Sequence, residues 1–346
     1  MCACDTITNT RGDCMICKDC KQDSPESEMK GKGKLYCDKC FVKRREFIKG
    51  RKYNLELLKA LPLEVKIAKS KLLLMEAFNR YGSGVYVSYS GGKDSTVLSH
   101  LARCIKPDIL HIFSNTTCEY PETLKQIMWE KEYNNMNLIT VRPFDKYGKP
   151  WNFKRVVNDQ GFPMFSKAVA NSIRTYRRAK TEQTRQNSID YITRRFKRFL
   201  EYKDINISDK CCEKLKKTPI KQIAKKLGME CAILGTLAEE SRQREMDWVN
   251  FGCNVFDIKK DNQCRPLSFW TEKDIYDYIE LYGLKISDLY LMGYTRNGCM
   301  FCGFGIEYDL CDGKNRFERL AQTHPKSYKY LIDNFKDILD SCGIKY

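Results

Sequence analysis

Short runs of β-branched, aromatic and small residues alternate along this chain with longer stretches in which apolar residues recur at helical spacing. The short runs predict five buried strands, at residues 85–89, 109–113, 138–141, 231–235 and 255–258. Strands that alternate with helices form a parallel sheet, which binds ligands at the carboxyl ends of its strands. The pattern therefore predicts an α/β fold with a parallel five-stranded sheet and flanking helices.

The segment before the first strand is predicted to be helical, because apolar side chains recur there every three or four positions. These positions are Leu55, Leu58, Leu61, Val65, Ala68 and Leu72. Pro62 predicts a break between a shorter and a longer helix, since proline has no N–H to donate and clashes with the preceding turn. We assign residues 51–80 to this linker.

The first strand runs into the sequence Ser90-Gly91-Gly92-Lys93-Asp94-Ser95, which predicts a sharp turn and the start of a helix. The two glycines permit a tight turn and let backbone N–H groups approach a ligand closely. With Lys93 beside the N–H groups of a helix N-terminus, this loop is predicted to bind phosphate or sulfate.

Composition sets outer limits on the kind of protein. The chain has 346 residues, of which 42% are hydrophobic, so a large core is expected. No run approaches the roughly 18 apolar residues of a membrane span, and the N-terminus lacks the apolar stretch of a signal peptide. We therefore expect a cytoplasmic protein with no membrane partner. The net charge of +17 favours polyanionic partners, or else reflects only a basic, solvated surface.

Eighteen cysteines in a chain expected to be cytoplasmic favour metal ligation over disulfides. Two CxxC pairs near the N-terminus have the spacing of a zinc ribbon, with Cys14 as a spare thiol. The four expected zinc ligands are Cys17, Cys20, Cys37 and Cys40. Residues 1–50 are predicted to form a separate unit that depends on this metal for its folding.

A second set of cysteines combines the adjacent pair Cys211 and Cys212 with the CxxC pair Cys299 and Cys302. Four thiols suit either zinc or an iron–sulfur cluster. Ahead of this set in the chain lies a basic insert, residues 167–203, with eleven Lys or Arg against three Asp or Glu. Such an insert is expected either to hold a nucleic-acid backbone or to be a solvated helical face, and the sequence favours neither.

The loop at residues 90–95 resembles the SGGxDS motif, or PP-loop, of ATP pyrophosphatases and of sulfonucleotide reductases. Further segments resemble the phosphoadenylyl-sulfate (PAPS/APS) reductase family over roughly residues 80–310. The segment that follows the second strand resembles the family's NTGxxxPET through Asn115, Thr116 and the run 121–123, and Glu119 within it is also expected at the nucleotide site. Thr117 stands there in place of Gly, so the backbone need not be identical. A later segment resembles the family's GxRxxESxxR through Gly235, Glu240, Ser241 and Arg244, with Leu237 in place of Arg.

This resemblance implies a Rossmann-like PP-loop fold whose loop and matching residues bind an adenine nucleotide. It also implies one [4Fe–4S] cluster on Cys211, Cys212, Cys299 and Cys302, with a second zinc site as the alternative. The family's nucleophilic tail thiol is matched by Cys342, although Ser341 and Lys345 depart from the usual tail residues. The domains expected are residues 81–290 for nucleotide binding and residues 291–346 for the C-terminal segment.

The resulting expectation is a PAPS/APS reductase-like enzyme in which Cys342, Lys93 and Asp94 are catalytic. Cys342 would attack the sulfur of the sulfonucleotide, and a thioredoxin-like reductant would release sulfite. The alternative is an ATP pyrophosphatase that activates DNA or RNA for sulfur insertion and uses Mg²⁺ with its ATP. A third interpretation, a nucleic-acid-binding accessory protein, is disfavoured by the intact loop. The sequence does not decide among APS, PAPS and ATP.

Overall fold

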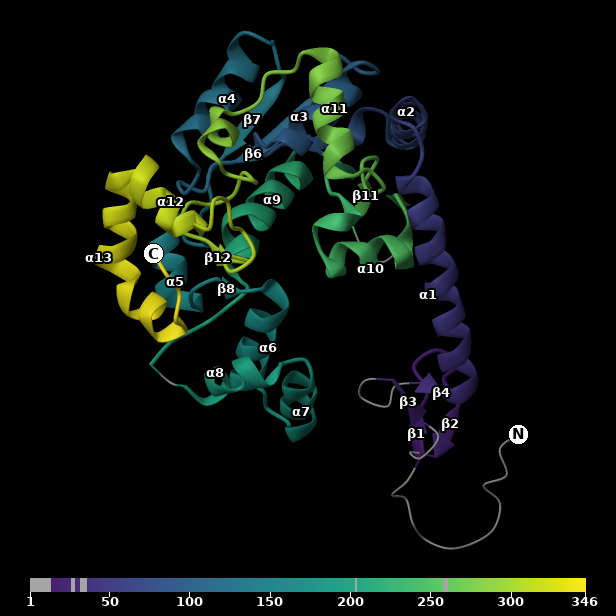
Figure 1. Cartoon of the computed structure of the whole chain (residues 1–346). Helices are drawn as coiled ribbons and strands as arrows, with labels where there is room; N and C mark the ends of the chain where they lie inside the picture. Colours follow the sequence, from purple (N-terminus) through teal and green to yellow (C-terminus); the bar gives the residue numbers. More distant parts are fainter. Residues whose placement is uncertain (1–13, 26–28, 32–35, 203, 258–260) are drawn as a thin grey trace, which may run out of the picture. The chain divides into compact units, whose positions relative to one another are not determined.

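The computed structural model describes residues 14–25, 29–31, 36–202, 204–257 and 261–346, and the chain divides into two compact units, Met1–Ala60 and Leu61–Tyr346. In the smaller unit, β1 (Cys14–Ile16) pairs with β2 (Asp23–Pro25), and β3 (Met29–Lys30) pairs with β4 (Tyr36–Cys37), both antiparallel. Helix α1 (Asp38–Lys59) follows directly (Figure 1). Among the described residues, no helix has the length and apolar character that a bilayer span requires.

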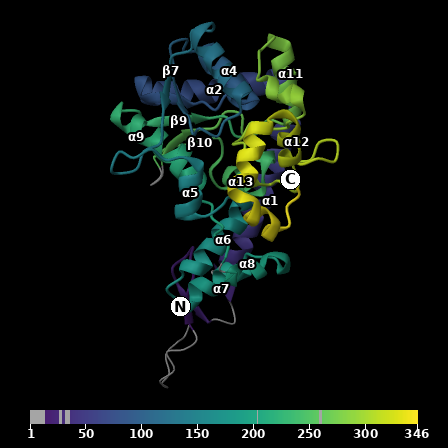
Figure 2. The ribbon, with the colours of Figure 1, turned by 90° about the vertical axis from the view of Figure 1, so that its left-hand side faces the viewer.

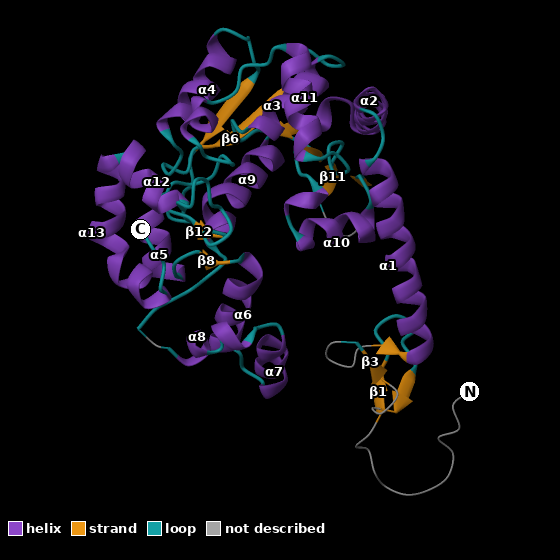
Figure 3. Ribbon diagram, in the orientation of Figure 1, coloured by secondary structure: helices purple, strands orange, loops and turns teal. Residues whose placement is uncertain are grey.

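The larger unit is built on a six-stranded sheet in the order β10-β11-β9-β5-β6-β7, part of which is visible in orange in Figure 3. The strands are β5 (Val85–Ser88), β6 (Leu110–Ser114), β7 (Leu138–Val141), β9 (Cys231–Leu234), β10 (Asn254–Val255) and β11 (Asn262–Cys264). All neighbouring strands are parallel except β10, which pairs antiparallel with β11. The mixed α/β class and the mostly parallel sheet are as predicted.

The predicted strand at residues 255–258 is not the fifth parallel strand of the sheet. Residues 254–255 form a short antiparallel edge strand, and residue 258 of the predicted strand lies outside the described part of the chain. The fifth parallel strand is β11, whose residues are Asn262, Gln263 and Cys264. A short, mostly polar strand carries no apolar run, so the sequence pattern did not reveal it.

Helices cover both faces of the sheet. Tyr86 and Ile112 pack against α9 (Thr218–Lys226) on one face. Phe113, the next residue along β6, packs against Ile127 of α4 (Pro121–Glu132) on the other, because successive side chains of a strand point to opposite faces. The same unit contains α2 (Leu63–Tyr81), α3 (Lys93–Arg103), α10 (Arg242–Phe251) and α11 (Glu272–Tyr282).

The largest apolar cluster gathers segments that follow β6 in the chain. It includes side chains from α5 (Phe153–Gln160), α6 (Lys167–Arg178), α12 (Arg316–Thr323) and α13 (Pro325–Cys342). A parallel pair of two-residue strands, β8 (Met164–Phe165) and β12 (Gly303–Phe304), runs through it. A Cβ on Gly303 would lie 2.7 Å from the carbonyl oxygen of Pro163, so only glycine fits at this contact.

The basic insert forms short helices in the same unit, visible as α6, α7 (Glu182–Asp190) and α8 (Arg198–Glu201) in Figure 2. One side of the insert is apolar and buried, and it includes Ile173, Ile192 and Phe199. Most of its cations face solvent, namely Lys167, Arg178, Lys180, Arg185, Arg194, Arg195, Lys197 and Arg198. The insert therefore packs its apolar side into the largest apolar cluster and exposes its basic side to solvent.

Candidate functional site

The PP-loop lies between the end of β5 and the start of α3, as the sequence predicted. Gly91 has φ +73°, and a Cβ there would lie 2.7 Å from Ile127 Cγ1, so both its backbone and its surroundings require glycine. Ser95 Oγ donates to the carbonyl oxygen of Gly92 at 2.8 Å and lies 3.1 Å from Ser90 Oγ. These contacts fix the turn in a compact form at the helix N-terminus.

Charged side chains surround the loop. Lys93 Nζ lies 3.2 Å from Asp94 Oδ1 and 3.1 Å from Glu272 Oε1. Burial lowers the pKa of Lys93, but Asp94, Tyr290 and Glu272 outweigh this and raise it overall. Burial also raises the pKa of Asp94, against the opposing effect of Lys93. The lysine is therefore a firmly charged cation beside a half-buried carboxyl group.

Two residues from the C-terminal part of the chain, which the sequence analysis did not single out, form hydrogen bonds with the loop. Tyr290 Oη accepts a hydrogen bond from the backbone N–H of Lys93 at 2.9 Å. Asn297 Nδ2 donates to the carbonyl oxygen of Ser90 at 3.2 Å, while its Oδ1 accepts from Thr123 Oγ1 at 2.9 Å. Asn297 lies two residues before Cys299, so the loop and the CxxC segment are in direct contact.

The segment after β6 also carries predicted residues. Glu119 accepts hydrogen bonds from Thr116, through the backbone N–H at 3.0 Å and through Oγ1 at 2.7 Å. Asn115 Oδ1 accepts from the N–H of Thr117 at 3.0 Å. Thr117, which replaces the family's glycine, has φ +64°. The backbone thus adopts the left-handed conformation that glycine favours, at the cost of steric strain for a β-branched residue.

The third group of predicted residues follows β9. Glu240 pairs with Arg244, and Ser241 Oγ accepts from the N–H of Arg244 at 3.3 Å as the N-cap of α10. Burial lowers the pKa of Arg244, and the charge of Asp94 opposes that change. This interaction of the Arg244 and Asp94 charges links the segment electrostatically to the PP-loop. Arg296, which the sequence did not single out, interacts with the charges of both Arg244 and Cys302.

The second cysteine set is brought together from two distant segments. Cys211 and Cys212 directly precede a π-helical turn, Glu213–Lys217, and Cys299 and Cys302 lie in the loop before β12. The charges of Cys299 and Cys302 both act on Cys211. The backbone of Cys299 forms a β-bridge with Glu119, which joins the set to the segment after β6.

Cations offset the charge of these thiols. A hydrogen bond from Cys211 lowers the pKa of Cys212 to about 5, with Lys167, Lys216 and Lys217 acting in the same direction. Burial raises the pKa of Cys299 to about 11, and Lys216 opposes that rise. The attraction between Cys299 and Lys216 raises the pKa of the lysine in turn. Lys216 also lies 4.0 Å from Glu119 Oε1.

The N-terminal cysteines have a different geometry. The sulfur atoms of Cys17, Cys20, Cys37 and Cys40 lie within 4.8 Å of one another, and no other such group of metal-binding side chains occurs among the described residues. Backbone N–H groups, that of Cys20 foremost, lower the pKa of Cys17 to about 6. The side chain of Cys14, the predicted spare thiol, lies outside the described part of the structure.

Cys342, the predicted tail nucleophile, is the last residue of α13 and is 4% exposed. Burial raises its pKa to about 12. The residues beyond it are also held, because Ile344 is buried and the carbonyl oxygen of Lys345 accepts from Asn315 Nδ2 at 2.9 Å. The structure thus places Cys342 in the apolar cluster, where the charge of Arg198 favours a thiolate but burial outweighs it.

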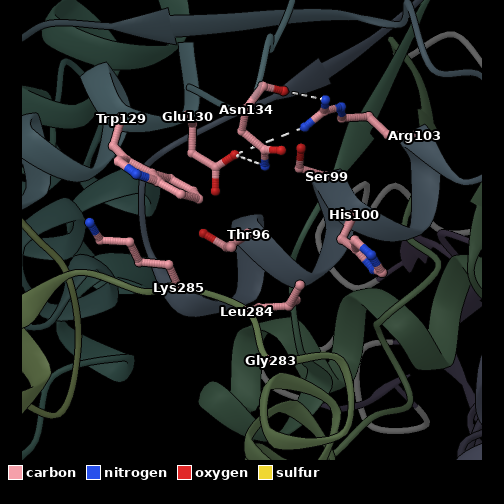
Figure 4. Close-up of a pocket in the computed structure, with 10 residues that line it drawn as sticks. All are labelled: Thr96, Ser99, His100, Arg103, Trp129, Glu130, Asn134, Gly283, Leu284 and Lys285. Carbon is pink, nitrogen blue, oxygen red and sulfur yellow. Dashed lines mark hydrogen bonds and ion pairs between the residues drawn. The ribbon is translucent and has the colours of Figure 1, made fainter. Parts of the chain in front are cut away.

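A cavity of about 260 Å³ lies between α3, α4 and the turn after α11, and its lining includes none of the residues that the sequence predicted for the site. Figure 4 shows Glu130, Asn134 and Arg103 linked to one another at its edge. Glu130 is buried and also accepts from Gln126 Nε2 at 3.2 Å. Its charge is satisfied by the protein itself, and we assign the cavity no function.

Comparison with known proteins places the chain in a family. A curated adenosine 5'-phosphosulfate reductase of Geobacillus kaustophilus is 25% identical over 232 residues, which are 66% of this chain and 77% of that protein. An uncharacterized protein of Methanocaldococcus jannaschii is 22% identical over 296 residues, 86% of this chain. The match spans only 57% of that relative's own length.

Solved structures show limited likeness. A phosphoadenylyl-sulfate reductase of Candida auris aligns with a TM-score of 0.43 and 13% identity, over 72% of this chain and 93% of that one. A U34-tRNA thiolase of Methanococcus maripaludis, solved with its [4Fe–4S] cluster, has a TM-score of 0.34 and 15% identity, over 94% and 88%. Both TM-scores are below 0.5, so this likeness says nothing about the reaction.

The phosphoadenosine phosphosulfate reductase domain matches residues 84–167 and 162–303. These residues include the PP-loop, the segment after β6 and all four cysteines of the second set. They make up more than half of the chain. The protein therefore belongs to the phosphoadenosine phosphosulfate reductase family of PP-loop enzymes.

Proposed function

We propose that this enzyme uses its PP-loop to bind ATP and to adenylylate a group in a nucleic acid, which then accepts sulfur. The observation that carries this choice over sulfonucleotide reduction is the position of Cys342. A reductase of this family needs an accessible tail thiolate, whereas Cys342 is buried and its pKa is raised to about 12. Adenylylation needs no such thiol.

In this proposal the PP-loop holds the phosphates that leave. Backbone N–H groups at the start of α3 and the Lys93 ammonium would bind the pyrophosphate. Asp94 offers a carboxylate oxygen for Mg²⁺, which would neutralise further phosphate charge. Arg244, whose charge interacts with that of Asp94, would contact the remaining phosphate.

The proposed reaction has two steps, adenylylation of the acceptor and its displacement by sulfur. An oxygen of the acceptor attacks the α-phosphorus of ATP, and the bond to the β-phosphate oxygen breaks, so that pyrophosphate leaves with the bonding electrons. A sulfide donor then attacks the activated carbon, and AMP departs with the acceptor oxygen. No net electron transfer occurs when the donor is sulfide. Lys93 stabilises the negative charge that develops on the leaving pyrophosphate.

The second cysteine set fits an iron–sulfur cluster better than a single zinc ion. Zinc at about 2.3 Å from each sulfur requires thiolates about 3.8 Å apart. No three of these four thiols lie within 4.8 Å of one another, although their charges interact and Lys216 offsets them. Cys211, Cys212, Cys299 and Cys302 would hold the cluster, which supplies a redox centre whose potential depends on its hydrogen bonds and solvent exposure.

The exposed cations of the basic insert are the reason for proposing a nucleic acid as the acceptor. The basic insert presents Arg178, Lys180, Arg194 and Lys197 to solvent, and none has an ion-pair partner among the described residues. Clustered cations of this kind bind phosphate backbones and make the affinity dependent on salt. DNA and RNA both fit this argument.

Sulfonucleotide reduction is the second candidate, and the 25% identical APS reductase favours it. In that case Cys342 would attack the sulfur of APS or PAPS, the nucleotide would leave, and a thioredoxin-like dithiol would reduce the resulting thiosulfonate to release sulfite. This route requires Cys342 to leave its buried position at the end of α13.

The test measures pyrophosphate release from ATP, with and without RNA or DNA, and sulfite release from APS and PAPS, in anaerobic protein. We expect nucleic-acid-stimulated pyrophosphate release that Lys93→Ala lowers about a hundredfold and Cys342→Ser leaves within about twofold, since one preorganised charge contributes roughly that much. Sulfite release that disappears in Cys342→Ser would overturn the proposal and establish the reductase.

A further inference from the structure

A second cavity, of about 300 Å³, lies beside the cysteine site rather than at the PP-loop. Its walls come from the segment after β6, the start of α5, the CxxC segment and the first turns of α13. In Figures 1 and 2, α5 and α13 lie close to each other at this part of the molecule. Its volume is at the lower end of the range for small-molecule pockets, roughly 300–1,000 Å³.

Aromatic rings form much of its lining. Phe153 and Phe301 are in contact, with ring centroids 5.5 Å apart, and Phe301 and Tyr330 are 5.2 Å apart. Phe153 and Phe301 are buried, whereas Tyr330 is 38% exposed at the edge. A planar aromatic group would find ring surfaces here, and nucleobases of any sequence stack on such side chains.

The polar part of the lining contains one charge. Lys326 is exposed and has no partner among the described residues, and it is the only charged side chain that they contribute to the cavity. Asn152 Oδ1 caps α5 by accepting from the N–H of Arg155, so the amide group of Asn152 remains able to donate. Thr117 and Ser327 add hydroxyl groups. Neutral hydrogen-bonding groups and a single cation suit a nucleobase that carries phosphate.

The cavity shares a wall with the cysteine site. Cys118 lines it and accepts, through its carbonyl oxygen, a hydrogen bond from the N–H of Met300 at 2.8 Å. Phe301, on the same wall, lies between Cys299 and Cys302 in the chain. An occupant of the cavity would therefore be held next to the CxxC segment and next to the segment that follows β6.

We propose that this cavity binds one unstacked nucleobase of the acceptor strand, with Lys326 at the adjoining phosphate. The proposal rests on the proposed function, because it takes the acceptor to be a nucleic acid. A base that leaves its stack needs an apolar, aromatic pocket to offset the lost stacking. Trp151, one residue before Asn152, packs against the apolar cluster, and its ring centroid lies 4.0 Å from Arg155 Cζ and 5.4 Å from the Lys214 ammonium.

The test measures binding of a fluorescein-labelled single-stranded RNA and of the DNA of the same sequence to the full-length protein without ATP. Tyr330→Ala is expected to weaken binding about tenfold, and Tyr330→Phe to preserve it, because the ring supplies the stacking. Lys326→Ala is expected to reduce the slope of log affinity against log salt by about 1. Tyr308→Ala and Lys329→Ala change exposed side chains outside the cavity lining and should bind as the wild type does.

A strand that carries 4-thiouridine provides an independent readout, and its photo-crosslink is expected at Tyr330 or Phe301. Unchanged affinity in both Tyr330→Ala and Lys326→Ala, or a crosslink confined to residues 167–202, would overturn the proposal. Pyrophosphate release without nucleic acid is measured on the same variants. Binding that depends on Tyr330 in a protein that releases no pyrophosphate would retain the pocket and reject the proposed function.

Discussion

The two cysteine sets differ in what positions their thiols. The N-terminal four lie within 4.8 Å of one another in a unit whose strands have two or three residues each. The second four are drawn from segments about ninety residues apart and belong to, or pack against, the largest apolar cluster. In the first set a metal ion would supply the folding energy, whereas in the second the protein core already holds the thiols near one another.

The largest expected effect is on the N-terminal unit. Cys37→Ser is expected to lose one zinc per chain and the hydrogen-exchange protection of β1–β4, because structural zinc contributes about 10–16 kcal/mol to small units of this kind. Elemental analysis and exchange mass spectrometry measure both. Cys104→Ser, an exposed thiol outside either set, is the control. Full zinc content and protection in Cys37→Ser would remove the proposed distinction between the sets.

The second set should behave in the opposite way. Cys299→Ser is expected to lower iron from about four atoms per chain to none in anaerobic protein, while far-ultraviolet circular dichroism remains unchanged, since the apolar cluster holds the fold. Cys118→Ser changes a buried neighbour that is no proposed ligand and should keep its iron. Equal iron loss in both variants, or zinc in place of iron, would contradict the assignment.

A smaller, local effect concerns Cys342, which belongs to neither set. Its pKa of about 12, against an ordinary value of 9.0, implies about a thousandfold less thiolate at about pH 8. We expect iodoacetamide to alkylate Cys342 far more slowly than the exposed Cys104, as peptide mass spectrometry would measure. Because the folded pKa is raised, the associated stability is complete below about pH 9 and is lost as the pH rises toward about 12. Equal alkylation rates would show that the tail opens and would favour the reductase.

The parts of the fold that the sequence revealed are those with a local signal. Residues 138–141 form β7 as predicted, and the PP-loop lies between strand and helix as its glycines require. The apolar positions before β5 were less informative. Val65 and Leu72 are 46% and 65% exposed on α2, whereas Leu74 is buried, as is Lys66. Lys66 pairs with Asp274 of α11 at 2.5 Å, a tertiary contact that periodicity does not encode.

The candidate site shows the same limit. Family motifs singled out Thr116 and Arg244 but not Tyr290, Asn297 or Arg296, because these three act through contacts across the fold. Thr117 shows the opposite case. Because Thr replaces the family's glycine there, the sequence allowed a different backbone conformation, yet the structure has φ +64° at this residue. The surrounding segment determines this backbone conformation, although it is strained for a threonine.

The amide of Asn297 joins the loop that would hold the nucleotide to the segment that carries Cys299 and Cys302. A ligand that shifted one of these segments relative to the other would change the free energy of binding at the second site. By thermodynamic reciprocity, a nucleotide that tightens binding at the cysteines by some factor is itself bound more tightly by the same factor once they are occupied. Asn297 is a direct side-chain contact through which occupancy of one site would reach the other.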